Sequence, residues 1–291
     1  MQSLKPDFLD SPYYLAHPDV MSHVVWKQMG RTNFLVTTAS VQNAGPTEVA
    51  PVANADAGQS TSSDGDVADP SQFEAAELHC VATIGLEDCW LNPDGNFPIP
   101  GGATELAKVT LNCQAVSPPN SGKYAAPYTK SMAVLRGLAD RVKTPGFSLK
   151  GMLDSKKPGF KLRHVPFRLP EDDSDKGCEL EGLEDWPVKK QQGESAKIEM
   201  EGKYVVDRLC AYDLGGRIIA PEDYMSKLPG ATVAATFTLT HFSFKNKGED
   251  TIVADIVKLR VIESKIAAPS SPRKRRAVPE MDESPKKKRK A

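Results

Sequence analysis

The sequence has few of the features that mark membrane, secreted or metal-finger proteins. No apolar run approaches the roughly 18 residues of a membrane-spanning helix, and residues 1–7 lack the apolar stretch of a secretory leader. The five cysteines are odd in number, dispersed and never spaced as CxxC. We therefore expect reduced thiols, no zinc finger and no membrane partner.

Motifs of common catalytic sites are also missing. The five histidines are dispersed, none falls in an HExxH motif, and no GxGxxG or phosphate-binding loop follows a strand-like run. His79 and Cys80 are adjacent, so on a strand their side chains would point to opposite faces. We predict a protein that is not an enzyme and holds no cofactor. A metal site that the fold assembles from dispersed His and Cys is left open.

Charge of both signs is present but is segregated along the chain. The net charge is -1, yet residues 41–75 carry six acidic and no basic residues, and residues 170–186 carry eight acidic residues and one Lys. Residues 266–291 carry nine basic and three acidic residues. The remainder is therefore mildly basic, which permits a polyanionic partner without requiring one.

Composition divides the chain into a body, residues 1–265, and a basic tail, residues 266–291, which we predict to be disordered. Residues 44–72 are rich in Ala, Ser, Thr, Gly, Pro and Asp and contain no aromatic residue. Such a segment cannot bury enough apolar surface to offset the entropy of ordering. We predict a disordered acidic loop there, either an insertion within a sheet or an interdomain linker, and a second acidic loop over residues 170–200.

Alternating apolar and polar residues, many of them β-branched or aromatic, predict a body that is mainly β with minor α. In Thr251–Glu263 we expect one buried face and one basic outer face. The buried face would hold Val253, Val257, Leu259 and Val261, and the outer face Lys258 and Arg260. The other strand-like runs are Phe34–Thr38, Leu78–Ile84, Leu106–Val116, Phe160–Leu169, Tyr204–Tyr212 and Thr232–Phe244.

Helical patterns are scarce. Thr129–Val142 begins with a Thr and has apolar residues at helical spacing. A shorter helix is predicted to open at Pro221, because Pro and acidic residues favour a first turn. These two helices supply the minor α content of the predicted body.

The strand-like run Thr232–Phe244 changes phase near its end. Its apolar residues alternate regularly up to His241, after which Phe242 and Phe244 fall on the formerly polar face. Two explanations are open: a β-bulge or sheet corner at this point, or aromatic residues exposed for stacking.

The C-terminal part of the body resembles a known family. A Gly-x-x-Val start at Gly230, a Phe-rich strand, a polar turn and a final run reading Ile-Val-Lys-Leu-Arg-Val-Ile-Glu look like the closing hairpin of OB-fold single-stranded-DNA-binding proteins of the compact viral and phage type. The resemblance implies an OB-fold-like barrel that binds nucleic acid through basic and aromatic residues on one face. Phage-type proteins usually end in an acidic tail, whereas this chain ends in a basic one.

Basic and aromatic residues interleave on several of these runs, a pattern that suits stacking of bases and contacts to phosphates without sequence preference. Taken singly, an aromatic residue on a strand is more often part of the core, and a Lys or Arg is more often plain solvated surface. The predicted nucleic-acid-binding residues are Trp26, Lys27, Arg31, Tyr124, Tyr128, Lys161, Arg163, Arg168, Phe242, Phe244, Lys258 and Arg260.

The tail contains two compact basic clusters separated by a spacer. Clusters arranged in this way resemble a two-part nuclear import signal, in which an import receptor binds an unfolded peptide. We favour this interpretation over a nucleic-acid-binding arm and predict a nuclear location. The residues predicted to contact the receptor are Arg273, Lys274, Arg275, Arg276, Lys286, Lys287, Lys288, Arg289 and Lys290.

A Ser-Pro pair precedes each basic cluster. Ser271 and Ser284 resemble sites of proline-directed, cyclin-dependent kinases, and the same Ser-Pro-basic pattern resembles segments that lie in AT-rich minor grooves. Phosphorylation would add about -1.5 to -2 charges beside each cluster and weaken either use. We predict that both serines are phosphorylated and control import or DNA contact.

These observations together predict a nuclear, non-catalytic protein that binds single-stranded nucleic acid, DNA in preference to RNA. It would act as an accessory factor in replication or recombination, or for a mobile element. Two alternatives are open: a nuclear protein-interaction or structural module, and a duplex-DNA-binding regulator that uses the basic tail. The sequence does not predict an oligomeric state.

Overall fold

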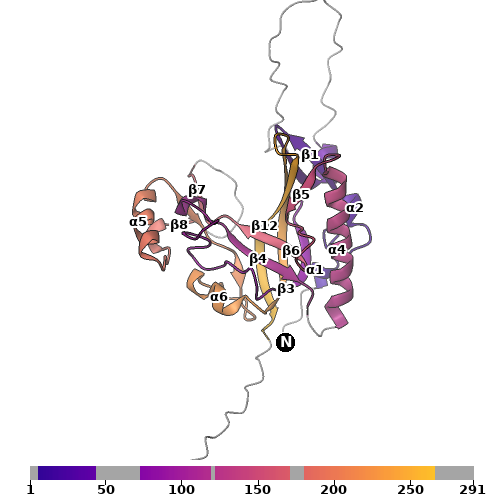
Figure 1. Cartoon of the computed structure of the whole chain (residues 1–291). Coiled ribbons are helices and arrows are strands. Elements are labelled where there is room, and N and C mark those ends of the chain that lie inside the picture. The colour runs from indigo at the N-terminus through magenta and orange to yellow at the C-terminus, as the bar shows by residue number, and fades with distance from the viewer. Residues whose placement is uncertain (1–5, 44–72, 119–121, 171–179, 266–291) are drawn as a thin grey trace, which may run out of the picture.

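The structure is a computed structural model that describes residues 6–43, 73–118, 122–170 and 180–265 (Figure 1). The predicted disordered loop 44–72 and the basic tail 266–291 lie outside these residues, as does most of the acidic stretch before residue 180. Within the described part, no helix is long and apolar enough to cross a membrane. No cluster of three or more His, Cys, Asp and Glu residues that could hold a metal ion is found there either.

Most strands of the described residues join one large sheet, which bears out the predicted mainly β class. Its order is β1-β2-β11-β3-β4-β6-β12-β10, and β5 pairs with the first residues of β12, from Glu249 to Ile252. Its strands are β1 (Val24–Met29), β2 (Thr32–Thr37), β3 (Leu78–Ile84), β4 (Leu111–Val116), β5 (Ser148–Gly151), β6 (Phe160–His164), β10 (Ala211–Tyr212), β11 (Thr232–Phe244) and β12 (Glu249–Glu263).

Shorter elements complete the described part. A second sheet has the order β7-β9-β8, and three 3-10 helices accompany the α-helices. These elements are β7 (Phe167–Arg168), β8 (Leu180–Glu181), β9 (Val205–Asp207), α1 (Pro6–Leu9), α2 (Val20–His23), α3 (Thr38–Asn43), α4 (Gly122–Val142), α5 (Gln191–Met200), α6 (Tyr224–Lys227), η2 (Leu106–Lys108), η3 (Leu183–Asp185) and η4 (Pro221–Asp223).

Five strands of the large sheet close on themselves. Strand β11 pairs with β3 on one side and β12 on the other, and the path β3-β4-β6-β12 completes the ring. This arrangement agrees with the predicted OB-fold-like architecture. Phe160 of β6 and Phe237 of β11 meet inside the ring with their ring centroids 5.4 Å apart, and both are fully buried. The core therefore sits within the ring.

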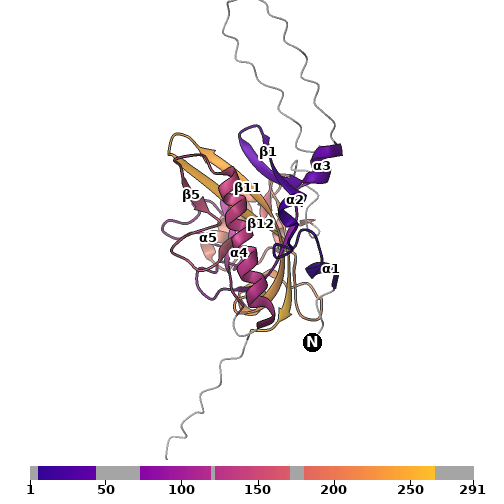
Figure 2. The same ribbon diagram turned by 90° about the vertical axis from the view of Figure 1, so that its right-hand side faces the viewer.

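The long hairpin β11–β12 extends beyond the ring and is widened by β2 and β1 on one side and β5 on the other. Helix α4 covers one face of this extension (Figure 2). On that covered face, Nε1 of Trp26 donates a hydrogen bond to the carbonyl oxygen of Leu138 in α4 (2.9 Å). The backbone N–H of Thr144, just after α4, donates to the fully buried carboxylate of Asp250. We call the opposite face of this sheet the outer face.

The Asp250 carboxylate is charged although it is buried. Burial by itself raises a carboxyl pKa, but hydrogen bonds from Thr144 and Ser243 and the nearby His241 hold the pKa of Asp250 below its ordinary value. Asn33 donates to Nδ1 of His241 (3.0 Å), which leaves the proton on Nε2, 3.4 Å from an Asp250 oxygen. This polar network ties the hairpin to β2 and to the end of α4.

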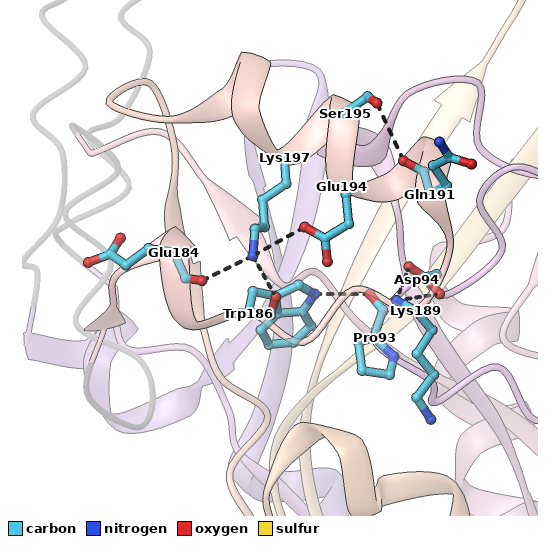
Figure 3. Close-up of polar contacts among 9 residues, drawn as sticks. All are labelled: Pro93, Asp94, Glu184, Trp186, Lys189, Gln191, Glu194, Ser195 and Lys197. Atoms are coloured by element: carbon cyan, nitrogen blue, oxygen red, sulfur yellow. Dashed lines mark hydrogen bonds and ion pairs between the residues drawn. The ribbon is translucent and has the colours of Figure 1, made fainter.

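The second sheet and α5 are attached to the ring by a buried tryptophan (Figure 3). Trp186 is 2% exposed, and its Nε1 donates to the carbonyl oxygen of Pro93 (3.0 Å). Lys197 of α5 donates to the carbonyl oxygens of Glu184 and Trp186 at 3.0 and 3.2 Å. Residues 170–200 are therefore not a loop throughout, because η3 and α5 form within them.

The phase of β12 differs from the prediction. Opposite Thr236 and Phe237 of β11, the partners in β12 are Lys258 and Ile256, so Val257 is an extra residue of a β-bulge. The bulge reverses the alternation, and the buried positions before it include Ala254 and Ile256 rather than Val253. Val253 and Val257 therefore do not share the buried face of Leu259 and Val261, and that part of the prediction is wrong. No register shift occurs at His241, where one had been a possible explanation.

Other local predictions are corrected by backbone chemistry. The run Phe160–Leu169 is broken between β6 and β7 at Pro166, which has no N–H for a ladder hydrogen bond. The helix expected at Thr129 begins at Gly122.

The cysteines of the described residues were predicted to be reduced. Cys80, Cys89 and Cys113 are free thiols, and burial raises the pKa of Cys80 to about 12. Cys210 is disulfide-bonded, so the prediction of reduced thiols is wrong there.

Candidate nucleic-acid interface

A row of cross-strand partners runs over the outer face. Thr238 pairs with Asp255, Asp255 with Arg163, Arg163 with Asn112, and Asn112 with Trp90 in an isolated bridge. Cross-strand partners share a face of the sheet, so these side chains follow one another across β11, β12, β6 and β4. We call them the outer row. Strands lie about 4.8 Å apart, so the row follows about 19 Å of curved surface.

A parallel row lies on the extended part of the sheet. Lys27 pairs with Phe34, Phe34 with Thr240, and Thr240 with Val253. We call these four residues the upper row. The ammonium of Lys27 also lies 5.1 Å from the ring centre of Phe73. The upper row therefore places a cation and an aromatic ring beside the threonine-lined strand β11.

A cavity of about 280 Å³ opens between the two rows. Phe34, Thr238, Thr240 and Val257 line it on the sheet, and Arg168 of β7 lines it from the second sheet. The guanidinium of Arg168 lies 3.2 Å from a carboxylate oxygen of Asp207. The cavity offers apolar walls and hydroxyls beside a cation, a combination that suits a base with its neighbouring phosphate.

The wall beside Arg168 carries two titratable groups with shifted pKa values. Burial lowers the pKa of His164, whose Nε2 donates to the carbonyl oxygen of Asp207 (2.7 Å). Burial also raises the pKa of the Asp207 carboxyl, against the opposing effect of His164 and Arg168. Both shifts have the same cause, namely the low polarity of this wall. His164 is therefore neutral at pH 7 and serves as a hydrogen-bond donor.

Arg163 is held at the centre of the outer row by a two-point ion pair. Its Nε lies 2.7 Å from Oδ1 of Asp255, and its Nη2 lies 2.9 Å from Oδ2. The two side chains are 30% and 32% exposed, so the pair faces solvent in part. A guanidinium with this planar fork also matches the oxygens of a phosphate.

Cations continue along β12 after the bulge. Lys258 pairs with Thr236 and Arg260 with Ala234, and the Lys258 ammonium lies 5.1 Å from the ring centre of Tyr212. At the other end of the hairpin, Phe244 is 43% exposed and the Lys247 ammonium lies 5.9 Å from its ring centre. The outer face therefore carries a cation beside an aromatic ring toward each end of the hairpin.

The structure brings together most of the residues predicted from the sequence to bind nucleic acid. Lys27, Lys161, Arg163, Phe242, Phe244, Lys258 and Arg260 all lie on the outer face, and Arg168 borders its cavity. Arg31 is an exposed residue of the turn between β1 and β2. The predicted roles of these residues stay predictions.

Three aromatic residues of that prediction are placed elsewhere. Tyr124 and Tyr128 are each 5% exposed, because both lie on the buried side of α4, and the Tyr128 hydroxyl donates to the carbonyl oxygen of Ala115 (2.9 Å). No ring face is left for a base, so these two predictions are wrong. Trp26 pairs with Leu35 and faces α4 rather than the outer face, so it too is corrected to a structural role.

Sequence reasoning missed Phe34, Asp255 and Trp90. In the sequence, Phe34 and Asp255 are marked only as members of strand-like runs. Trp90 stands in a short polar segment without strand alternation. No local signal places these residues in one surface, because each position depends on pairing with a strand distant in sequence.

No protein-family model matches the chain, and no curated protein matches it. Among solved structures, gp2.5, a single-stranded DNA binding protein encoded by bacteriophage T7, is similar at 8% identity with a TM-score of 0.30, covering 66% of this chain and 93% of its own. The single-stranded DNA-binding protein of bacteriophage Enc34 in complex with ssDNA shows 11% identity, a TM-score of 0.31, and coverage of 66% and 89%. Its C-terminal truncation shows 9%, 0.27, and 86% and 98%. TM-scores this low do not establish a shared fold.

Proposed function

We propose that this chain binds single-stranded nucleic acid across the outer face, without catalysis. The observation that carries the proposal is the placement of Lys27, Phe34 and Arg163 in two adjacent rows on one continuous sheet surface. A cavity of about 280 Å³ separates the two rows. Stacking of a base on an aromatic ring contributes about 1–3 kcal/mol, and cations compensate the phosphates.

Single strands fit this surface better than a duplex does. In a single strand the base faces are free to stack on Phe34 and Phe244, whereas in a duplex they are covered by neighbouring bases. We propose DNA in preference to RNA because the closing hairpin of the body resembles that of single-stranded-DNA-binding proteins in its sequence. The body alone is expected to account for this binding.

The test is fluorescence anisotropy of labelled oligo(dT), oligo(rU) and a duplex of the same length, titrated with the full chain at two salt concentrations. A matched variant carries Gln in place of the nine basic tail residues. Salt-sensitive binding of oligo(dT) that survives in the tail variant supports the proposal. Binding that is lost in the tail variant, or a preference for the duplex, assigns the contact to the tail and overturns it.

We also propose that the basic tail directs the protein to the nucleus, where it serves replication, recombination or a mobile element. The sequence of the two clusters supports this, and the tail lies outside the described residues. A fluorescent fusion with Arg275 and Lys288 replaced by Ala, one in each cluster, should lose nuclear accumulation. Disulfides are uncommon in nuclear proteins. A reduced Cys210 thiol in isolated nuclei would therefore agree with the proposed location, and a disulfide at Cys210 would count against it.

Phosphorylation of Ser271 and Ser284 is proposed as the control of that import. Added negative charge beside each cluster opposes binding to an acidic receptor groove. Replacing both serines with Glu should shift the fusion toward the cytoplasm, and replacing both with Ala should not. If the Glu variant keeps its nuclear accumulation and its DNA affinity, control by phosphorylation of these two serines is refuted.

A protein-interaction role is the second candidate. Two exposed apolar side chains favour it, since Leu86 is 78% exposed and Ile198 of α5 is 65% exposed. Single exposed apolar residues are common on soluble proteins, so the observation carries less weight than the two rows. If the chain binds none of the three oligonucleotides, a protein-interaction role becomes the favoured function.

A further inference from the structure

Trp90 differs from the other two tryptophans of the chain. The indole N–H of Trp26 donates to Leu138, and that of Trp186 donates to Pro93, so both side chains anchor the fold. Trp90 is 40% exposed, and within the described residues its indole N–H has no hydrogen-bond acceptor. The exposed Trp90 indole is therefore not used as an anchor of the fold, and part of its ring is open to contact from solvent.

The backbone holds Trp90 firmly although its side chain is exposed. The Trp90 N–H donates to the carbonyl oxygen of Asn112 (2.7 Å), and the Asn112 N–H donates back to Trp90 (3.2 Å). The preceding loop is closed at its start by a bond from the Gly85 N–H to Gln114 (2.7 Å). The indole is therefore presented from a fixed position at the end of the outer row.

The loop before Trp90 is also fixed by charge. Asp88 has a φ of +51°, in the left-handed region that Asp tolerates better than most residues. Its carboxylate lies 2.8 Å from the Lys157 ammonium. A cavity of about 300 Å³ lies beside this pair, and its lining includes Trp90, Gln114 and Lys161.

Lys161 supplies a cation that no described acid neutralises through an ion pair. Its side chain is exposed, and no described carboxylate lies within 4.0 Å of its ammonium. Desolvation lowers the pKa of Lys161, repulsion from Lys157 and Arg163 adds to this effect, and the Asp88 carboxylate opposes it. Asp88 and Asp154 also line the cavity, so an anion would relieve this repulsion where it lies on the Lys161 side, beside Trp90.

Lys161 also connects Trp90 to the rest of the interface. It is two residues from Arg163 on β6, and residues i and i+2 of a strand share a face about 7 Å apart. From Phe34 to Trp90 the surface crosses five strand spacings, about 24 Å of contour. Cations and rings thus continue from the upper row past Arg163 and Lys161 to Trp90.

We propose that Trp90 and Lys161 form a second contact point for single-stranded nucleic acid, in which a base stacks on the Trp90 indole and the adjacent phosphate contacts Lys161. This inference rests on the proposed function and extends its footprint around the ring. The site accepts any base, because stacking on an indole uses the π-face that all bases share.

The test is quenching of intrinsic tryptophan fluorescence by unlabelled oligo(dT), read beside the anisotropy of labelled oligo(dT). We expect quenching in the native chain and in the matched control Trp26→Phe, and its loss in Trp90→Phe. Trp90→Ala should weaken binding by about 5- to 150-fold, the factor that corresponds to about 1–3 kcal/mol. Lys161→Gln should reduce the slope of log affinity against log salt by about 0.7, and Lys130→Gln, which removes an exposed cation from α4, should leave it unchanged.

The outcomes separate the two proposals. If the chain binds oligo(dT) by anisotropy but Trp90→Phe keeps the quenching and Trp90→Ala keeps the affinity, the contact at Trp90 is refuted and the proposed function stands. If no oligonucleotide binds, both are refuted, and Trp90 belongs to a protein contact instead. A short oligo(dT) that binds equally well to the native chain and to Trp90→Ala, while a long one discriminates, supports the position of Trp90 at the end of the surface.

Discussion

Arg163 of β6 and Asp255 of β12 form a two-point ion pair at the centre of the outer row, although they are 92 positions apart in the sequence. The Asp255 carboxylate occupies the same guanidinium fork that a phosphate would use. In the free protein it keeps Arg163 extended over the sheet and neutralises its charge. Binding of a phosphate at Arg163 must therefore compete with Asp255.

Replacing Asp255 with Asn should strengthen binding of oligo(dT) by a few-fold. The change removes the competing carboxylate and makes the outer face more positive by one charge, so the salt dependence should also steepen, by about 0.7 in slope. Anisotropy titration at several salt concentrations measures both effects. Asp140→Asn, the same change on α4 at the opposite side of the sheet, is the control. Weaker binding by Asp255→Asn would mean that Arg163 acts only when the ion pair is intact.

Replacing Phe244 with Ala should weaken oligo(dT) binding by about 1 kcal/mol, since the ring is exposed and able to stack on a base. Stability should change by less than about 0.5 kcal/mol, because a surface side chain makes few contacts. Ile198→Ala, which removes a similarly exposed apolar side chain from α5, is the matched control for binding. Equal affinity in both variants would place the tip of the hairpin outside the interface.

Replacing Trp186 with Phe should lower the free energy of unfolding by about 1–3 kcal/mol. The change leaves the buried carbonyl oxygen of Pro93 without its donor, and an unpaired buried acceptor carries a desolvation cost of that size. Urea denaturation measures the effect. Trp90→Phe is the control, because its indole is exposed and unanchored. If the two variants lose equal stability, Trp186 is not the attachment point of α5 and the second sheet.

Stability should fall as the pH is lowered below about 6.5. Burial lowers the pKa of His164 and of His79 in the folded state below the ordinary value of 6.5. The unfolded state therefore binds protons first, and the free energy of unfolding decreases as pH falls through that range. His164→Gln, whose amide keeps a donor for Asp207, should make the decrease shallower in urea titrations between neutral and mildly acidic pH. An unchanged slope would show that His164 is not the responsible group.

The sequence by itself determined the position of the most regular strands. The bounds of β3 and β11 follow from runs of β-branched and aromatic residues, Leu78–Ile84 and Thr232–Phe244, and both agree with the structure. Alternation with a period of two residues is a local property, so it can be read without knowledge of neighbouring strands. The same property places Lys161 and Arg163 together on one face of β6.

Only the tertiary structure decided which faces meet and which residues form the interface. The bulge at Val257 reverses the alternation of β12, and it exists only because β11 pairs with both ends of that strand. Tyr128 faces the core because α4 packs against the ring, and Trp90 joins the outer row only through its pairing with Asn112. Strand neighbours and register are set by contacts between residues far apart in the chain, and these contacts leave no signal in any one segment of it.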